Sequence, residues 1–315
     1  MKLQGAAKVP QTERNIRKGK LYGVIAALTW VTIWPLSKII TRDYPSIDQF
    51  FIAFVRFFSA ALAIFCIFLI KKERSFLSTV KNHWRLALLL GFFGIFGMGS
   101  LVFFSIKYTS SVNSALLMNS NAMFIIVFSV FIGEKITPAK GIGALLGAFG
   151  CYLIINNGFG LKLFSSATLK GDLLALGAAV CWAIYTVVGR ARVKNVNSTH
   201  ISALNFFFGS LMILALTFIL GVPATGIFQP VPFSMMLYIG LIPTAYGFTI
   251  WYYALEHVEA GALGLYQFLV PLLTAIIGVL FLNETFTVFT FFGMVAILSG
   301  IILTGIIGGE KPAGD

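Results

Sequence analysis

One charged side chain stands inside an apolar stretch of the chain. Between Gln49 and Ile70 the only charged residue is Arg56. Charged residues within apolar stretches of membrane-crossing length are rare and usually functional, and a guanidinium pairs readily with carboxylate or phosphate groups. Arg56 could therefore hold an anionic group of a ligand. It could equally cap backbone carbonyls or tie neighbouring segments together, and both possibilities stay open.

Uncharged polar side chains interrupt two other apolar stretches. Amide and hydroxyl groups are unfavourable against lipid tails, so part of each group should face protein or water. These side chains could line a cavity or make hydrogen bonds between helices. They are Asn119, Ser120 and Asn121 in one stretch, and Tyr266 and Gln267 in the other.

Aromatic residues lie deep within several apolar stretches. Such side chains often pack in a core or anchor a helix at the membrane interface. Alternatively, they form the wall of a cavity, which would suit an apolar or aromatic side chain on a substrate. The candidates for such a wall are Trp30, Trp182, Tyr185 and Tyr246.

The elements that position these residues must be membrane helices. Hydrophobic residues make up 58% of the 315 residues, charged residues only 11%, and the mean hydropathy is +0.91. A soluble domain carries about 25% charged residues, so the chain is an integral membrane protein. Its apolar stretches are near the roughly 20 residues that a helix needs to cross the hydrocarbon core. They are ten in number, at 20–40, 46–70, 86–106, 110–132, 138–156, 171–190, 198–220, 232–254, 259–282 and 286–308.

The distribution of basic residues predicts the orientation. Ten spans place both termini on one side of the membrane, and most Lys and Arg residues lie on that side. Basic loops stay in the cytoplasm, so we expect both termini on the cytoplasmic side of the inner membrane. The net charge of +12 then reflects a basic face against anionic lipid rather than a nucleic-acid partner. Residues 1–18 and 309–315 are predicted to be cytoplasmic tails.

The two halves of the chain resemble each other. Residues 131–155 align without gaps on 281–305, and residues 19–38 align on 171–190. Because each half holds five spans, the second half must cross the membrane in the opposite direction, as in many secondary transporters. The predicted fold class is therefore all-α integral membrane, with ten transmembrane helices as two inverted five-helix repeats. The predicted units are 19–156 and 171–308, joined by an extracytoplasmic linker at 157–170.

The repeat also relates single residues. Asn205 takes the place of Arg56 in the second half, and Glu134 and Glu284 stand at equivalent span ends on opposite membrane faces. We expect each glutamate to close a turn through hydrogen bonds from backbone N–H groups to its carboxylate. Three prolines inside spans are candidate kinks or hinges. They are Pro35, Pro243 and Pro271.

These features resemble the drug/metabolite transporter superfamily, and within it the EamA-type ten-span permeases. The resemblance covers nearly all of residues 19–308. It rests on GDLL (171–174) followed by CWA (181–183), and on GEKIT (133–137) and NETFT (283–287). It implies transport of amino acids, their derivatives, sugars, nucleotide-linked compounds or other metabolites. This chain departs from the pattern at Asn121, where relatives usually carry a proline.

We therefore expect an alternating-access carrier for a small metabolite, most simply an amino acid or a derivative, moved outward. A sugar or nucleotide carrier of the same superfamily is the alternative. An integral membrane enzyme would need clustered His, Asp, Glu or Cys at one membrane face, which the sequence does not supply. Cys66, Cys151 and Cys181 show no metal or disulfide spacing, so neither metal nor cofactor is expected. Monomer and homodimer both stay open.

Overall fold

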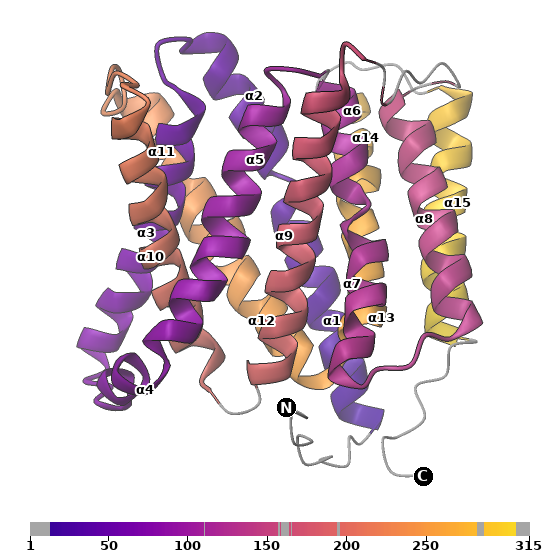
Figure 1. The fold of residues 1–315 in the computed structure, drawn as a ribbon, viewed down its shortest axis with the longest axis horizontal. Helices are drawn as coiled ribbons and strands as arrows, with labels where there is room; N and C mark the ends of the chain where they lie inside the picture. The colour runs from indigo at the N-terminus through magenta and orange to yellow at the C-terminus, as the bar shows by residue number, and fades with distance from the viewer. Residues whose placement is uncertain are drawn as a thin grey trace.

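The structure, a computed structural model, describes residues 13–109, 111–156, 158, 164, 166–193, 196–281 and 287–306. Within these residues every regular element is a helix (Figure 1). The first half contains α1 (Glu13–Trp30), α2 (Ile33–Asp43), α3 (Gln49–Ile70), α4 (Ser75–Leu90), η1 (Gly91–Gly97), α5 (Met98–Ser105), α6 (Ser111–Asn119), α7 (Asn121–Ser129), η2 (Val130–Ile132) and α8 (Pro138–Asn156). The second half contains α9 (Leu169–Val193), α10 (Ser198–Ile219), α11 (Pro230–Ile239), η3 (Gly240–Tyr246), α12 (Gly247–His257), α13 (Ala260–Gly264), η4 (Leu265–Phe268), α14 (Leu269–Phe281) and α15 (Val288–Ile306).

These helices form ten membrane spans, because several continue one another with only a bend between them. Within the described chain, 8 helices are long and apolar enough to cross a membrane, and two shorter apolar helices run over Ala260–Thr274 and Val288–Leu303. The prediction of an all-α membrane protein with ten helices is confirmed. The third span begins at Ser75 rather than at residue 86, because the basic stretch around Lys81 and Arg85 is helical instead of a loop.

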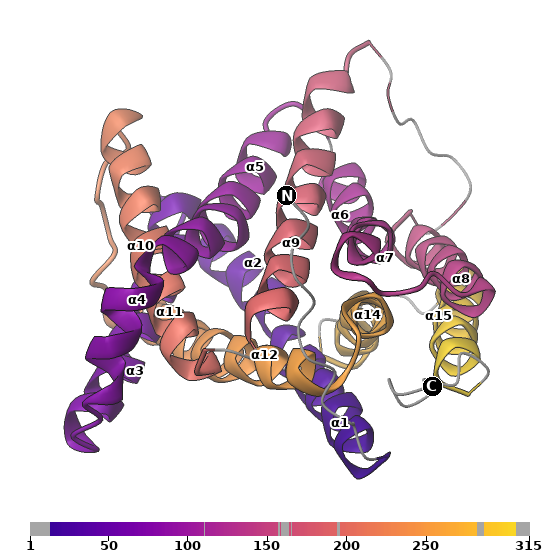
Figure 2. The same cartoon turned by 60° about the horizontal axis from the view of Figure 1, so that its bottom comes forward.

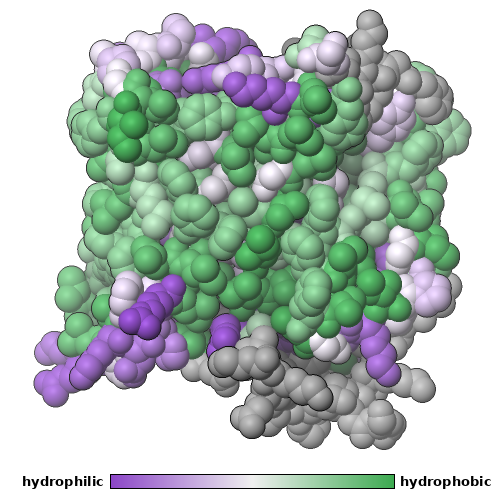
Figure 3. All heavy atoms as spheres, in the orientation of Figure 1, coloured by the Kyte–Doolittle hydropathy of each residue, from purple (hydrophilic) through white to green (hydrophobic). Residues whose placement is uncertain are grey.

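The molecule has two polar ends and an apolar waist. Apolar side chains cover the middle of the visible surface, and polar ones gather at its two ends (Figure 3). α1 begins and α15 ends at the same end, which we call the terminal face; the other end is the opposite face (Figure 1). The turn at 133–137 belongs to the terminal face, and the turn at 44–48 belongs to the opposite face.

The helices pack in pairs that follow a two-fold relation between the halves. The second span packs on the seventh (α3 on α10), and the fifth packs on the tenth (α8 on α15). The first span packs on the eighth (α1 on α12) as the sixth packs on the third (α9 on α5), so one pair maps onto the other. α8 and α15 lie side by side at one edge of the bundle (Figures 1 and 2). The repeat found in the sequence is thus also a repeat of contacts.

Two π-helical segments occupy equivalent places in the third and eighth spans, η1 and η3. Gly91 in η1 lies against the backbone oxygen of Asn205, and Gly240 in η3 lies against that of Arg56. A Cβ at either glycine would overlap that oxygen, so only glycine permits the two backbones to approach so closely. The matching contacts agree with the alignment of Arg56 on Asn205. π-helical segments often occur at functional sites, and these two flank the centre of the bundle.

Candidate functional site

A cavity of about 810 Å³ lies between the two halves and takes its walls from both. Its floor lies about midway along the spans, at Trp30, Trp182, Phe248 and Gln267. The remaining wall extends toward the opposite face, up to Ser37, Phe103, Ile155 and Thr290. The cavity therefore reaches from the middle of the protein toward the opposite face and is closed toward the terminal face.

Arg56 is the only charged residue among the described cavity-lining residues. Its Nε donates a hydrogen bond to Thr244 Oγ1 at 2.6 Å. Its guanidinium carbon lies 4.6 Å from the centre of the Phe57 ring and 5.7 Å from that of Phe248. Among the ion pairs of the described residues, none involves Arg56. The guanidinium is thus positioned by a hydroxyl and two aromatic rings, and no carboxylate of the described residues pairs with it.

Pro243 explains how Thr244 comes to serve Arg56. A proline has no N–H, so the carbonyl four residues earlier, that of Ile239, loses its usual helical donor. The Thr244 hydroxyl donates to this carbonyl at 2.8 Å and keeps its lone pairs for Arg56. The Pro243 carbonyl in turn accepts a hydrogen bond from Trp30 Nε1 at 3.0 Å. Pro243 and Thr244 therefore position both Arg56 and Trp30 in the cavity wall.

The floor of the cavity is aromatic. The ring centroids of Trp30, Trp182 and Phe248 lie 5.3–5.7 Å apart in pairs, each with an edge-to-face orientation. Such geometry is favourable between aromatic rings. Trp251, which is 0% exposed, packs beneath Trp30 with centroids 5.2 Å apart. This layer presents the faces and edges of aromatic rings on the same cavity wall that contains Arg56.

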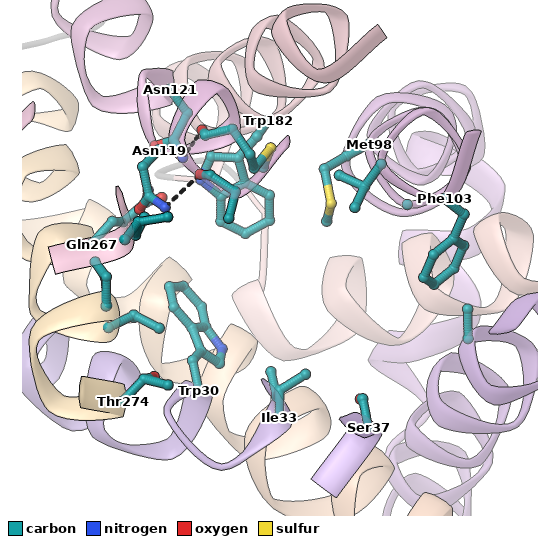
Figure 4. Close-up of a pocket in the computed structure, with 18 of the residues that line it drawn as sticks. Trp30, Ile33, Ser37, Met98, Phe103, Asn119, Asn121, Trp182, Gln267 and Thr274 are labelled. Carbon is teal, nitrogen blue, oxygen red and sulfur yellow. Dashed lines mark hydrogen bonds between the residues drawn. The ribbon is translucent and has the colours of Figure 1, made fainter. Parts of the chain in front are cut away.

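Amide side chains face the aromatic floor from the fourth and ninth spans. Asn119 and Gln267 lie on one side of the cavity, with Met98 and Phe103 across from them (Figure 4). The fourth span bends here, and its three polar side chains bond to the preceding helical turn. Asn119 Nδ2 donates to Ala115 O at 2.8 Å, Ser120 Oγ to Leu117 O at 2.6 Å, and Asn121 Nδ2 to Met118 O at 2.8 Å.

Several polar atoms of cavity-lining residues have no partner in the described protein. Asn121 Oδ1, Gln267 Nε2 and Thr274 Oγ1 are buried and make no hydrogen bond within the described protein. All three residues line the cavity. Pro271, also in the wall, withholds an N–H from the carbonyl of Gln267. The amide side of the cavity thus carries buried polar groups, both donors and acceptors, whose hydrogen bonds are not satisfied within the described protein.

Other residues singled out in the sequence lie elsewhere. Tyr185 and Asn205 are 0% exposed beneath the cavity floor, and Tyr246 is 51% exposed on the outer surface. Ser120 does not reach the wall, because its hydroxyl turns back onto its own helix. Tyr266 packs against the main hydrophobic core instead of lining the cavity. Pro35 lies in α2, just after the break at 31–32 that follows α1.

Sequence reasoning missed two residues that define the geometry around Arg56. Thr244 is its hydrogen-bond partner, and Phe248, one helical turn further, completes the aromatic floor. A usable signal existed for Thr244, because a threonine directly after a proline inside a span can satisfy the carbonyl that the proline leaves free. No local pattern distinguishes Phe248 from the other 31 phenylalanines of the chain, which contains 32.

Contacts between the two halves close the terminal face. The Glu134 carboxylate accepts hydrogen bonds from the backbone N–H groups of Ala260 at 2.8 Å and Gly261 at 3.0 Å. Its Oε1 also lies 3.5 Å from Arg190 Nε. The expected carboxylate-to-backbone bonds therefore exist, but they cap the start of the ninth span rather than the turn into the fifth. Glu284, its repeat equivalent, lies outside the described residues.

A second ionic contact, between Lys140 and Glu259, joins the same two halves. Lys140 is 3% exposed although it is charged, and its Nζ also donates to the Lys135 carbonyl at 3.1 Å. Burial raises the pKa of Glu134 above its ordinary value, and its two amide hydrogen bonds and Arg190 offset only part of that rise. In the described part of the chain, no three His, Cys, Asp or Glu residues group so that they could hold a metal ion.

The sequence profile of the EamA-like transporter family matches residues 17–156 and again residues 169–306. The chain belongs to this family. The two matches also place one family unit in each half of the EamA-like protein described above. Its family consists of transporters and not of enzymes, which agrees with a cavity that lacks clustered catalytic groups.

Known proteins similar to this EamA-like chain include an uncharacterized transporter of Archaeoglobus fulgidus. It is 29% identical over 283 residues, which cover 89% of this chain and 96% of the relative. The aromatic amino acid exporter YddG of Ancylobacter novellus is 27% identical over 209 residues, covering 64% of this chain and 69% of the exporter. A crystal structure with 21% identity superposes with a TM-score of 0.81 over 92% of this chain and 97% of its own, which shows the shared fold.

Proposed function

We propose that this protein is a secondary carrier that moves an amino acid, or a close derivative, with an apolar or aromatic side chain out of the cell. The observation that carries the proposal is Arg56, a guanidinium with no carboxylate partner in the described protein, in the wall of a cavity with an aromatic floor. In this proposal Arg56 binds the substrate carboxylate, and Trp30, Trp182 and Phe248 pack against its side chain.

The amide side of the cavity completes the proposed recognition. An α-ammonium group needs acceptors, and Asn121 Oδ1 is a buried acceptor without a partner in the described protein. Asn119 and Gln267, beside it, add further amide groups. The similarity to an aromatic amino acid exporter supports the same substrate class. For the orientation, the basic residues near the terminal face support a cytoplasmic location of that face in the inner membrane.

A thermal-shift screen with amino acids, sugars and nucleotides tests the substrate class. We expect Trp, Phe, Tyr and Leu to raise the unfolding temperature of the purified protein, because a ligand that binds only the folded state stabilises it. The proposal would be contradicted if only sugars or nucleotides raised the unfolding temperature.

Flux into proteoliposomes tests the mechanism. A carrier gives saturable uptake of the stabilising amino acid and exchange against an internal pool. Flux that rises linearly with concentration would indicate a channel instead. The direction follows from comparing uptake in vesicles of the two orientations, sorted by protease access to a tag on the terminal face.

A further inference from the structure

Polar side chains continue the line of the cavity beyond its aromatic floor. On α9, Tyr185 follows Trp182 by one helical turn toward the terminal face; on α12, Tyr252 follows Phe248 in the same way. The two tyrosine rings lie 5.3 Å apart, and the Asn205 amide lies close to both hydroxyls without a hydrogen bond of good geometry. We call Tyr185, Asn205 and Tyr252 the lower cluster. It lies beneath the floor, where the transport path must continue.

The lower cluster is buried but poorly satisfied. All three residues are 0% exposed. None of their polar side-chain atoms makes a hydrogen bond of good geometry within the described protein. A buried polar group without a well-formed hydrogen bond is unfavourable, and native proteins seldom leave one so. Three such residues side by side make the closed arrangement unfavourable here, and a state that exposes them to water or ligand would relieve it.

The repeat indicates what that other state is. Arg56 and Asn205 hold equivalent positions, against Gly240 and Gly91 respectively. Arg56 lines the cavity toward the opposite face, so the inverted relation places Asn205 in the corresponding wall toward the terminal face. Inverted halves can exchange conformations during transport. In the exchanged state the lower cluster takes the place that the Arg56 side has in this structure.

We propose that the lower cluster is a second, uncharged binding site, which receives the hydrogen-bonding end of the substrate when the carrier opens toward the terminal face. This inference rests on the proposed function. Two hydroxyls and an amide supply donors for a carboxylate and acceptors for an ammonium group, without any charge. Both tyrosine rings pack closely against a glycine. A side chain at Gly94 would overlap the Tyr185 ring, and one at Gly189 would overlap the Tyr252 ring.

Removing the hydroxyls separates this role from a structural one. In the double variant Tyr185→Phe with Tyr252→Phe, the closed state loses unsatisfied groups without losing volume. We expect a higher unfolding temperature in the absence of substrate, a substrate affinity within about twofold of wild type, and transport slowed about tenfold or more. Tyr246→Phe, at a 51% exposed position of the same span, is the matched control and should change none of the three.

Cysteine accessibility tests the same site without relying on stability. In protein with Cys66→Ser and Cys181→Ala, Asn205→Cys should react with a small thiol reagent from the terminal face during turnover, and bound substrate should slow the reaction. Cys151, buried in α8, serves as the internal reference and should stay unreacted.

The outcomes separate the two proposals. Wild-type protein that moves no amino acid overturns the proposed function and this inference with it. If the wild-type protein moves an amino acid, the inference alone is overturned when the double tyrosine variant is destabilised or when it transports normally. The inference is equally overturned if Asn205→Cys reacts no faster during turnover than Cys151.

Discussion

The surroundings of Arg56 and of Asn205 share one backbone arrangement and differ in their side chains. Both residues lie against a glycine that opens a π-helical segment, Gly240 in η3 and Gly91 in η1. Four residues after that glycine, η3 carries Thr244, which bonds Arg56, whereas η1 carries Ile95, which cannot. Arg56 is charged, bonded to Thr244 and lines a cavity; Asn205 is neutral, buried beneath the cavity floor and makes no hydrogen bond of good geometry in the described protein.

This difference shows that a two-fold backbone arrangement can carry unequal side chains at its two equivalent positions. The inverted backbone permits two related conformations, while unequal side chains make the two ends of the path unequal. In our proposal, the path holds a charged group toward the opposite face and only neutral groups toward the terminal face. This inequality comes from a few residues around the two π-helical segments, and the helices themselves remain nearly equivalent.

The largest change follows from removing the charge on the Arg56 side. Arg56→Gln should weaken amino-acid binding about 10–100-fold, because a hydrogen bond to a charged group contributes about 1.5–3 kcal/mol. Titration calorimetry on the purified variant measures it. Arg42→Gln is the control, since Arg42 is exposed and pairs with its neighbour Asp43. Loss of folded protein in Arg56→Gln would instead assign Arg56 a structural role.

A smaller change follows from giving η3 the character of η1. Thr244→Val keeps the shape of the side chain but removes the hydroxyl that joins the Ile239 carbonyl to Arg56. We expect a loss of about 1–3 kcal/mol in the free energy of unfolding and a weaker, though detectable, substrate affinity. Thr249→Val, whose hydroxyl bonds only its own helix at Ala245 O, controls for the loss of a threonine. If both substitutions changed the stability and the substrate affinity equally, Thr244 would not position Arg56.

We expect the folding stability to depend on pH through Glu134, which lies in the closed terminal face. Because burial raises the pKa of Glu134 in the folded protein, the folded state holds this proton more tightly than the unfolded state does. The stability from this group is therefore full below the ordinary pKa of 4.5 and is lost as the pH rises through the raised value. The unfolding temperature of wild type relative to Glu134→Gln should fall over that interval. A difference that stays constant or rises with pH would contradict it.

The smallest effect concerns the ends of the two equivalent helices α3 and α10. Each is followed by a residue with a left-handed backbone, Lys72 at φ 50 and Gly221 at φ 64. A lysine is strained there and a glycine is not. Lys72→Gly should raise the free energy of unfolding by about 0.5–1 kcal/mol without changing transport. Chemical denaturation measures the first and vesicle uptake the second; a destabilised Lys72→Gly would show that the helix ends are not equivalent.

The sequence predicted the membrane class, the ten spans and the alignment of Arg56 on Asn205. Hydropathy and the repeat can be recognised directly from the order of the residues. It also singled out Arg56, Trp30, Trp182 and the amides, all of which the structure brings to one cavity. It could not predict which aromatic residues face inward. Tyr246 and Tyr252 stand on the same span, yet one is 51% exposed and the other 0%. A period of 3.6 places these two tyrosines on different faces of the helix, but it does not say which face points inward.

The central claim, that Arg56 binds the substrate carboxylate, is tested most directly by a double-mutant cycle with a modified ligand. The affinities of phenylalanine and of phenylalanine amide are measured for wild type and for Arg56→Gln by titration calorimetry. We predict that replacing the carboxylate with an amide weakens binding to wild type about 10–100-fold but leaves binding to Arg56→Gln unchanged. The same loss for both proteins would contradict the claim, because the carboxylate would then be recognised without Arg56.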